Sequence, residues 1–241
     1  MKVGITGRNG FIGSALALKL RDCQIYSYPR RDLDILFHFG SPSSDFIFKQ
    51  NMDYCFSETI DSFLEMVKFC REHGIKLVYP SSATVYNKAT PYARCKSCLE
   101  EIHQAYGGDI LGLRIFAGYG PGEKHKGEYA SIVYQFCQQM KKGEQPVIYG
   151  DGNQTRDFVY IDDIVDNICD SLHKTGIIDI GTGVNTSFKS VVDFINWQLK
   201  TDIKPVYVER PQRYVDETPC DKPINFKVSI EEGIKRICEG L

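Results

Sequence analysis

The sequence predicts an α/β protein in which a doubly wound parallel sheet carries a smaller, interleaved second lobe. Short apolar runs rich in β-branched residues recur along the chain, each close to Gly, Pro or Ser, as expected of buried parallel strands. Between these runs lie longer segments in which apolar residues return every three or four positions, which is the spacing of a helix. Alternation of the two patterns is typical of a parallel sheet covered by helices.

The expected elements assign alternating stretches of the chain to the sheet and to the lobe. The expected strands are 3–5, 24–26, 35–37, 76–79, 110–116 and 177–180, and the expected helices of the same domain are 11–21, 53–73, 92–106 and 162–173. From residue 117 the sequence changes to loops rich in Gly and Pro, with helices near 128–141 and 186–199. The sheet domain therefore comprises 1–116 and 157–181, and the lobe comprises 117–156 and 182–241.

Composition and charge exclude several classes of protein. Of the 241 residues, 42% are hydrophobic and 25% are charged, which is the balance of a globular chain. The 29 Lys and Arg residues form no basic tract, so no nucleic-acid partner is expected. We find neither a secretory leader nor a run of about 18 apolar residues, and expect a cytoplasmic protein with no membrane partner. Nine cysteines, an odd number, favour a reducing compartment over a disulfide framework.

Three glycines at intervals of three stand between the first expected strand and the first expected helix. Glycine permits a tight turn and lets backbone N–H groups approach a pyrophosphate, which then lies at the positive end of the helix. The pattern, in this position, predicts the dinucleotide-binding turn of a Rossmann-type sheet. The residues expected to contact the cofactor here are Gly7, Arg8, Asn9, Gly10, Phe11, Ile12 and Gly13.

A phenol and an ammonium group share one face of a predicted helix. Tyr92 and Lys96 are four residues apart. A free phenol has a pKa of about 10, and lowering it toward 7 requires about 4 kcal/mol, which a neighbouring cation can supply. Ser82 follows the strand 76–79, and a hydroxyl at the carboxyl end of a strand faces the ligand-binding crevice. The three side chains therefore predict acid–base chemistry, with a solvated Tyr/Lys face as the alternative for the pair alone.

These motifs together resemble a known family. Gly7-x-x-Gly10-x-x-Gly13, the segment 81–86 (Ser-Ser-Ala-Thr-Val-Tyr) and Tyr92-x-x-x-Lys96 are similar to the extended short-chain dehydrogenase/reductases of the NAD-dependent epimerase/dehydratase family, which act on nucleotide-sugars. Within it the chain resembles UDP-glucose 4-epimerase-like enzymes in a shortened form. The resemblance implies that Ser82 hydrogen-bonds the reacting oxygen, that Tyr92 is the general base or acid, and that Lys96 contacts the nicotinamide ribose and tunes Tyr92. Tyr92 and Lys96 thereby also count as cofactor-binding residues.

The resemblance extends to the second lobe and makes it the nucleotide-sugar-binding part of the chain. The run 149–163 is the longest match, and it implies that Arg156 clamps the diphosphate, because a planar guanidinium can grip phosphate oxygens bidentately. Arg210 lies where a second family arginine approaches the nucleotide, although Arg210 and Arg213 could equally be solvated. The substrate contacts expected from the resemblance are Ser82, Thr84, Ala117, Tyr149, Arg156 and Arg210.

Departures from the family pattern narrow the chemistry. Ala83-Thr84 replaces the Asp-Glu pair of the 4,6-dehydratases, so elimination of water is disfavoured; Ala117 replaces the usual Asn, and the segment 86–92 is short. We expect an NAD(P)-dependent nucleotide-sugar epimerase, an isomerase that works by transient hydride transfer through a keto-sugar. The alternatives are an NADPH-dependent keto-sugar reductase, an oxidoreductase, and a catalytically weak dinucleotide or nucleotide-sugar binding protein.

The end of the second expected strand favours NADP over NAD. A NAD-selective site places an acid there, whereas this chain has Arg30 and Arg31, to which Arg8 could add a third guanidinium for a 2′-phosphate. Solvated surface arginines are the alternative. Asp32 and Leu33 resemble the family's pair that meets the adenine amine. Because only residues 29–33 separate the second and third strands, no crossover helix is expected, and the adenine pocket is expected to be open.

Two further expectations concern assembly and metals. The helices 53–73 and 92–106 resemble the pair through which the family often forms a four-helix dimer interface, and Phe56, Phe63 and Phe69 are expected to supply its apolar surface. A homodimer is therefore expected. Cys95 and Cys98 lie within a predicted helix with no second cysteine pair at metal spacing, so no metal site is expected.

Overall fold

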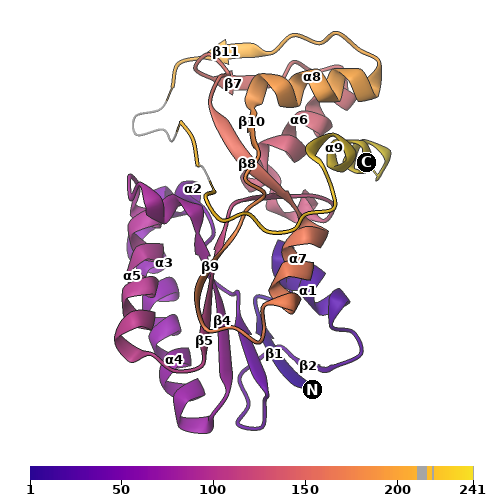
Figure 1. Ribbon diagram of the computed structural model, residues 1–241. Helices are drawn as coiled ribbons and strands as arrows, with labels where there is room; N and C mark the ends of the chain where they lie inside the picture. The colour runs from indigo at the N-terminus through magenta and orange to yellow at the C-terminus, as the bar shows by residue number, and fades with distance from the viewer. Residues whose placement is uncertain (211–215, 219, 241) are drawn as a thin grey trace. The chain divides into compact units, whose positions relative to one another are not determined.

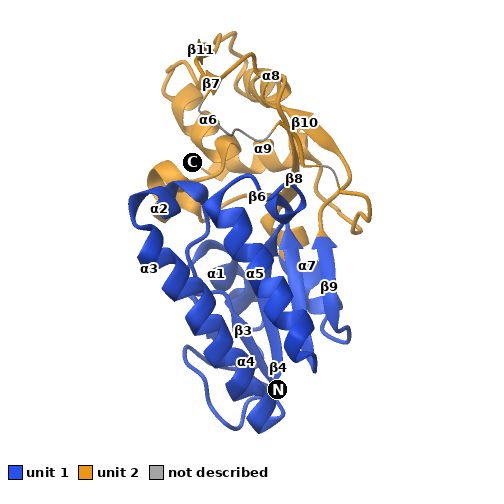
Figure 2. Cartoon of the chain, turned by 90° about the vertical axis from the view of Figure 1, so that its left-hand side faces the viewer, with its two compact units in different colours: residues 1–115, 165–179 blue, residues 116–164, 180–241 orange. Residues whose placement is uncertain are grey.

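The chain folds into two compact units. The computed structural model describes residues 1–210, 216–218 and 220–240, so Arg213 lies outside the described residues. One unit comprises 1–115 and 165–179, and the other comprises 116–164 and 180–241 (Figure 2). Binding of a dinucleotide by the sheet domain and of a nucleotide-sugar by the lobe stays a prediction. No helix in the described ranges is both long and apolar enough to span a bilayer.

The first unit contains a six-stranded sheet with the order β2-β1-β3-β4-β5-β9. Its strands are β1 (Lys2–Thr6), β2 (Gln24–Tyr26), β3 (Ile35–His38), β4 (Lys76–Ser82), β5 (Ile110–Ile115) and β9 (Gly176–Ile180). The pairs β1–β2, β1–β3, β3–β4 and β4–β5 are all parallel, which confirms the predicted fold class. The chain runs from β1 outward to β2 and then returns to β3 on the other side of β1. This reversal makes the carboxyl ends of β1 and β3 the switch point at which such sheets bind ligands.

Helices cover both faces of this sheet. They are α1 (Phe11–Lys19), α2 (Asp45–Gln50), α3 (Met52–Phe56), α4 (Ser62–His73), α5 (Pro91–Tyr106) and α7 (Ile161–Asp170), which begins in the second unit. In Figure 1, α4 and α5 lie on one side of the strands, and α1 and α7 lie on the other. The helix expected over 53–73 is divided by a π-helical turn at Ser57–Asp61, and residues 27–34 contain no helix, as expected.

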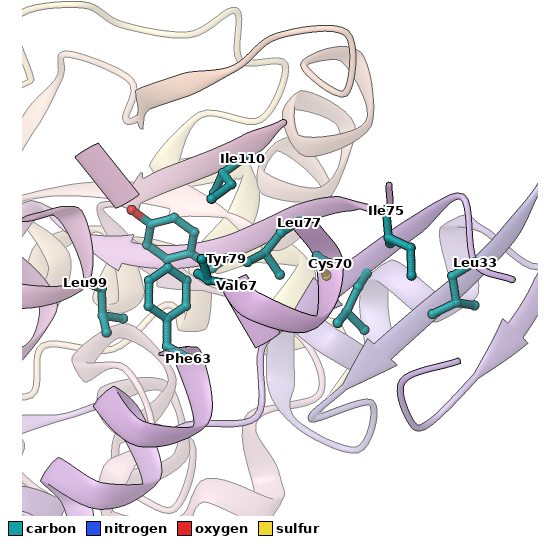
Figure 3. Close-up of a cluster of buried hydrophobic side chains, with 10 residues drawn as sticks. Leu33, Phe63, Val67, Cys70, Ile75, Leu77, Tyr79, Leu99 and Ile110 are labelled. Atoms are coloured by element: carbon teal, nitrogen blue, oxygen red, sulfur yellow. The ribbon is translucent and has the colours of Figure 1, made fainter. Parts of the chain in front are cut away.

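A buried cluster joins α4 and α5 to the sheet (Figure 3). Phe63 of α4 packs on Tyr79 of β4 with ring centroids 4.5 Å apart, and Leu99 of α5 belongs to the same cluster. Phe63 has no exposed surface, so its expected place on a dimer surface is wrong. Its position on α4 faces the strands, where an aromatic ring buries most apolar area. Phe56 and Phe69 are partly buried against such clusters.

The second unit combines two small sheets with helices. A three-stranded sheet has the order β10-β8-β6, and a two-stranded sheet pairs β11 with β7. The strands are β6 (Ala117–Tyr119), β7 (Val147–Tyr149), β8 (Thr155–Tyr160), β10 (Asn185–Ser187) and β11 (Val206–Val208). The helices are a 3₁₀ segment (Glu123–Tyr129), α6 (Ile132–Lys141), α8 (Phe188–Leu199) and α9 (Ile230–Gly240). The patterns near 128–141 and 186–199 thus correspond to α6 and α8, whereas α9 was not expected.

The third glycine of the turn is a packing requirement of the first unit. A Cβ atom on Gly13 would lie 2.2 Å from the carbonyl oxygen of Gly7, whereas one on Gly10 would lie 3.2 Å from the same atom. We expect Gly13→Ala to lower the free energy of unfolding by about 3 kcal/mol, because α1 cannot approach the turn, and Gly10→Ala to lower it by about 1 kcal/mol. Urea unfolding of both variants measures the difference. Equal losses would contradict the packing role of Gly13.

Candidate active site

Ser82 stands at the carboxyl end of β4, where the strand turns into a 3₁₀ segment (Ala83–Tyr86). The Ser82 backbone is extended and caps that segment, and its Oγ accepts hydrogen bonds from Thr84 N at 3.3 Å and from Thr84 Oγ1 at 3.0 Å. Both bonds use the oxygen of Ser82 as acceptor, so its own proton is left to donate. The Thr84 hydroxyl, expected to contact substrate, is thus directed at Ser82.

Tyr92 lies in the first turn of α5. Thr90 caps this helix by accepting a hydrogen bond from Ala93 N at 3.2 Å, and Pro91 occupies the first helical position. The Tyr92 ring packs edge to face against Phe48 of α2, with centroids 5.6 Å apart. Burial raises the pKa of Tyr92 to about 12, and a hydrogen bond from Ser82 acts in the opposite direction. Ser82 and Tyr92 are therefore brought together as predicted from the sequence.

Lys96 is the third member of the group and is 2% exposed. Its Nζ donates to Ser41 Oγ at 3.2 Å and to the carbonyl oxygen of Pro80 at 3.1 Å, and it lies 5.7 Å from the centre of the Tyr92 ring. None of the ion pairs formed by the described residues includes Lys96. Burial without a carboxylate lowers the pKa of Lys96 to about 8.

The electrostatics of the pair differ from the expectation drawn from spacing alone. The sequence predicts that Lys96 lowers the pKa of Tyr92 toward 7, yet burial dominates and raises the pKa of that phenol. The reason is geometric: the ammonium of Lys96 is held by Ser41 and by Pro80, and it faces the Tyr92 ring from 5.7 Å. In the chain by itself, Tyr92 is a proton donor at neutral pH.

The segment between Ser82 and Tyr92 is short and anchored at its start. The Tyr86 hydroxyl donates to Asp179 at 2.7 Å and accepts from Arg114 at 2.9 Å. The Arg114 guanidinium also lies 4.8 Å from the centre of the Tyr86 ring. These contacts fix the 3₁₀ segment to β5 and β9, so that only residues 87–90 are needed to reach α5.

The glycine turn has the form that an anionic cofactor group requires. Gly7 has a positive φ of 69°, and a Cβ atom there would lie 2.6 Å from the carbonyl carbon of Phe39. Gly10 N donates to Gly7 O at 2.9 Å, and Gly10 caps α1 without a side-chain hydrogen bond. Because no capping side chain covers the first N–H groups of α1 and no acid lies in its first turn, these groups fit a pyrophosphate. Arg8 and Asn9 are exposed beside them.

The residues expected at the adenosine end form an ion-pair group of their own. Arg30 Nε donates to Asp32 Oδ1 at 2.9 Å, and Lys2 Nζ contacts Asp32 Oδ2 at 2.9 Å. The hydrogen bonds from Arg30 and Lys2 hold the pKa of Asp32 well below its usual range. Arg31 is exposed, whereas Leu33 is buried in the cluster of Figure 3. Arg30 also stacks on Tyr26, with 4.3 Å between guanidinium and ring centre.

The expected substrate residues of the second unit gather partly around Asp216. Arg156 donates to the carbonyl oxygens of Thr155 at 2.7 Å and of Asp216 at 3.3 Å. Arg210 pairs with the carboxylate of Asp216 and lies 3.4 Å from Asp151. The structure therefore brings the two arginines to one acidic residue, which sequence reasoning missed. Tyr149 is exposed at the end of β7, and Ala117 opens β6.

Sequence reasoning also missed the segment that follows β3. Ser41, Asp45 and Phe48 all contribute to the surroundings of Tyr92 and Lys96. The signal that could have identified them is topological, since residues after β3 lie at the switch point. The π-helical turn and short α2 interrupt the helical spacing that would have revealed this segment.

Comparison with known proteins assigns the chain to a family. The NAD dependent epimerase/dehydratase family matches residues 24–181, which is more than half of the chain. The protein therefore belongs to the NAD dependent epimerase/dehydratase family, as its sequence motifs indicated.

Solved structures share the fold over nearly the full chain. A UDP-N-acetylglucosamine 4-epimerase from Methanobrevibacter ruminantium M1, in complex with UDP-N-acetylmuramic acid, is 24% identical with a TM-score of 0.88, over 99% of this chain and 97% of that chain. A UDP-glucose 4-epimerase from Thermotoga maritima, with UDP-glucose, is 23% identical with a TM-score of 0.87, over 99% and 98%. A UDP-glucose 4-epimerase from Thermus thermophilus, in complex with NAD, is 21% identical with a TM-score of 0.87, over 99% and 98%. At these identities the likeness shows a common fold.

Burial of the Lys96 ammonium has a measurable thermodynamic cost. The pKa of Lys96 is about 8 in the folded chain against 10.5 for an ordinary lysine, so the unfolded chain binds the extra proton between these values. The cost is fully present at pH 7 and is relieved as pH rises from 8 through 10.5. We expect Lys96→Met to raise the free energy of unfolding at pH 7 by about 1–3 kcal/mol and to lose this advantage near pH 10.5.

Urea unfolding at several pH values tests this expectation, with the exposed Lys68 as matched control. Lys68→Met should leave stability within about 0.5 kcal/mol of the original at each pH. A Lys96→Met variant whose stability follows the original chain at all pH values would contradict the burial argument.

Proposed function

We propose that the protein is a nucleotide-sugar epimerase that uses a bound nicotinamide dinucleotide. One observation carries the proposal: Ser82, Tyr92 and the buried Lys96 meet within one unit, whose glycine turn after β1 fits a pyrophosphate. Family membership supports a NAD-dependent reaction. Two proteins of the same fold are named 4-epimerases and were solved with UDP-sugars, which supports a nucleotide-diphosphate sugar as substrate.

The cofactor would be held along the switch point of the sheet. The turn from Gly7 to Gly13 would hold its pyrophosphate at the N-terminus of α1, and Tyr92 and Lys96 would contact the nicotinamide ribose. The adenosine end would lie near Arg30 and Arg31, whereas Asp32 pairs with Lys2 at the start of β1 and the Leu33 side chain is buried in the core. When bound, the nicotinamide supplies a reversible hydride acceptor.

The side chains of the first unit would transfer the proton of the sugar hydroxyl. Tyr92 Oη would take the proton of the sugar hydroxyl while hydride leaves the same carbon, and would return it after the keto-sugar has turned over. Ser82, whose own proton is left to donate, would bind the reacting oxygen. The positive charge of Lys96 favours the phenolate that forms on Tyr92, and each unit by which the pKa of Tyr92 falls raises the phenolate fraction about tenfold.

The second unit would bind the diphosphate. Arg156 and Arg210 already share Asp216 as an acceptor. A diphosphate offers the same arginines more oxygens in the bidentate arrangement that guanidinium groups prefer. Thr84, Ala117 and Tyr149 complete the proposed set of substrate contacts.

An epimerase is favoured over a dehydratase, and two other functions stay open to test. Ala83 and Thr84 follow Ser82, so no carboxylate is supplied at these positions to eliminate water. A keto-sugar reductase would consume NADPH stoichiometrically, and a weak binding protein would bind without turnover. NMR of UDP-, GDP- and dTDP-sugars incubated with the protein, with and without NADPH, separates all three. The predicted homodimer also stays a prediction.

Tyr92→Phe is the sharpest test of the catalytic assignment. The variant keeps the ring that packs on Phe48 but loses the phenol proton, so we expect turnover to fall by about 10²–10⁴-fold while cofactor binding is retained. Tyr54→Phe, at an exposed position of α3, is the matched control and should retain full turnover. A Tyr92→Phe variant within about a factor of 10 of the original chain would overturn the assignment.

The predicted NADP preference now depends mainly on Arg31 and Arg8, because Arg30 is engaged with Asp32. We expect Arg31→Ala to weaken NADP binding by about tenfold and to leave NAD binding unchanged, because only NADP carries the 2′-phosphate. Calorimetric titration of the original chain and of Arg30→Ala and Arg31→Ala with both cofactors measures this. Equal or tighter binding of NAD, unaffected by either substitution, would show that NAD is the cofactor.

A further inference from the structure

Asp45 is an acidic residue beside Tyr92 that belongs to none of the motifs described above. It occupies the first position of α2, a helix capped by Ser44. Phe48 is three residues further on, so Asp45 and Phe48 share one face of this helix. Phe48 is fully buried and packs on the Tyr92 ring, with 5.6 Å between the ring centroids. The face of α2 that carries Asp45 is therefore directed at the first turn of α5.

The contacts of Asp45 tie it to that first turn. Its carboxylate accepts hydrogen bonds from the Thr90 side chain and from the backbone N–H of Tyr92. Thr90 is the capping residue of α5, so one carboxylate serves both the cap and the residue that carries the phenol. A negative charge at this point is also favourable to the N-terminus of α5.

One oxygen of this carboxylate is left over. Asp45 Oδ1 is buried and makes no hydrogen bond to any described residue. A buried acceptor without a partner is costly, and such groups are expected where a structure serves a purpose other than its own stability. The charge therefore acts on its neighbours through a medium that screens it poorly.

We propose that Asp45 is a positioning residue that sets a negative charge against the first turn of α5 and thereby adds to burial in disfavouring ionisation of the Tyr92 phenol. This role goes beyond the Ser82, Tyr92 and Lys96 group, and its effect on turnover rests on the proposed function. The charge of Asp45 raises the pKa of Tyr92, in addition to the larger effect of burial. Lys96, whose ammonium lies 5.7 Å from the centre of the Tyr92 ring, carries the opposite charge.

Few other charged or titratable groups contribute to this balance. Lys49 of α2 faces Asp45 and lowers the pKa of that carboxyl, which burial raises. Cys95 and Lys96 of α5 face Tyr92, and Ser82 of β4 hydrogen-bonds it. His38 of β3 stays uncharged at neutral pH, because burial and Lys96 lower its pKa to about 4.

The test reads the phenol directly, in the full chain without added cofactor. Tyrosine is replaced throughout by 3-fluorotyrosine, whose more acidic phenol titrates at lower pH, and the Tyr92 resonance is assigned in ¹⁹F NMR by its loss in Tyr92→Phe. We expect Asp45→Asn to lower the titration midpoint of residue 92 by about one pH unit. Asp45→Glu, which keeps the charge, should stay near the original midpoint, and Asp53→Asn, an exposed acid of α3, should not change it. Asp45→Ser replaces Asp45→Asn as the neutral variant if the latter does not fold.

Two outcomes overturn the inference. An unchanged midpoint in the neutral variant removes the electrostatic role, and equal shifts in Asp45→Asn and Asp45→Glu reduce Asp45 to a packing residue. A second measurement links the role to turnover: the rate at neutral pH should rise about tenfold in Asp45→Asn if the phenolate form limits it. A shifted midpoint without turnover on any nucleotide-sugar leaves the inference standing and counts against the proposed function, whereas turnover with an unshifted midpoint does the reverse.

Discussion

The close approach of the glycine turn to the end of β3 is the constraint on which the first unit depends. Gly7 lies so near Phe39 and Gly40 that a single added carbon would collide with their backbone. Thr6 secures the approach, because its Oγ1 accepts a hydrogen bond from Gly40 N at 3.2 Å and contacts His38 Nδ1 at 2.9 Å. This contact fixes where the chain leaves β3. Ser41 can then hold Lys96, and α2 can pack on α5, so the glycine turn and the group formed by Ser82, Tyr92 and Lys96 are positioned by the same contact.

Charge is treated differently at the proposed site than elsewhere in the same unit. Glu100 is buried, but it accepts two hydrogen bonds from Arg114, at 2.9 and 2.7 Å, and one from Ser81. In this bidentate pair, the charges of Glu100 and Arg114 compensate each other. Lys96 is buried and Asp45 is partly buried, yet among the described residues Lys96 is held by neutral oxygens and the buried Oδ1 of Asp45 is left without a partner. Imperfectly compensated charges are expected where they shift the pKa of a functional group, and both of these residues adjoin Tyr92.

The parts of the fold that follow local rules were predictable, and those set by tertiary contacts were not. The glycine turn and the start of β4 are encoded by spacing and by strand chemistry, so the sequence alone located them, whereas β4 continues to Ser82, three residues beyond the predicted end. The proposed roles of Ser82, Tyr92 and Lys96 came from resemblance. The raised pKa of Tyr92 could not be foreseen, since burial is not visible in a four-residue spacing. Phe63 was wrongly predicted to lie on a dimer surface for a related reason. Apolar spacing identifies the apolar face of a helix, but it does not say whether that face packs on the sheet or on another subunit. Asp45 was missed because its partners, Thr90 and Tyr92, are far from it in the sequence and come close only in the folded chain.

The short connection between β2 and β3 shows that these parallel strands are joined without a crossover helix. Residues 27–34 pass from β2 to β3 without a helix. Ion pairs of Asp32 with Arg30 and Lys2, and the stacking of Arg30 on Tyr26, hold this connection against β1 and β2. Exposed ion pairs of this kind contribute little stability. The contact that positions the proposed site lies on the other side of β1, between Gly7 and the end of β3. The absence of a helix in residues 27–34 therefore leaves the switch point intact. It affects the proposed adenosine end, where Arg30 and Asp32 pair with each other and Arg31 is exposed to solvent.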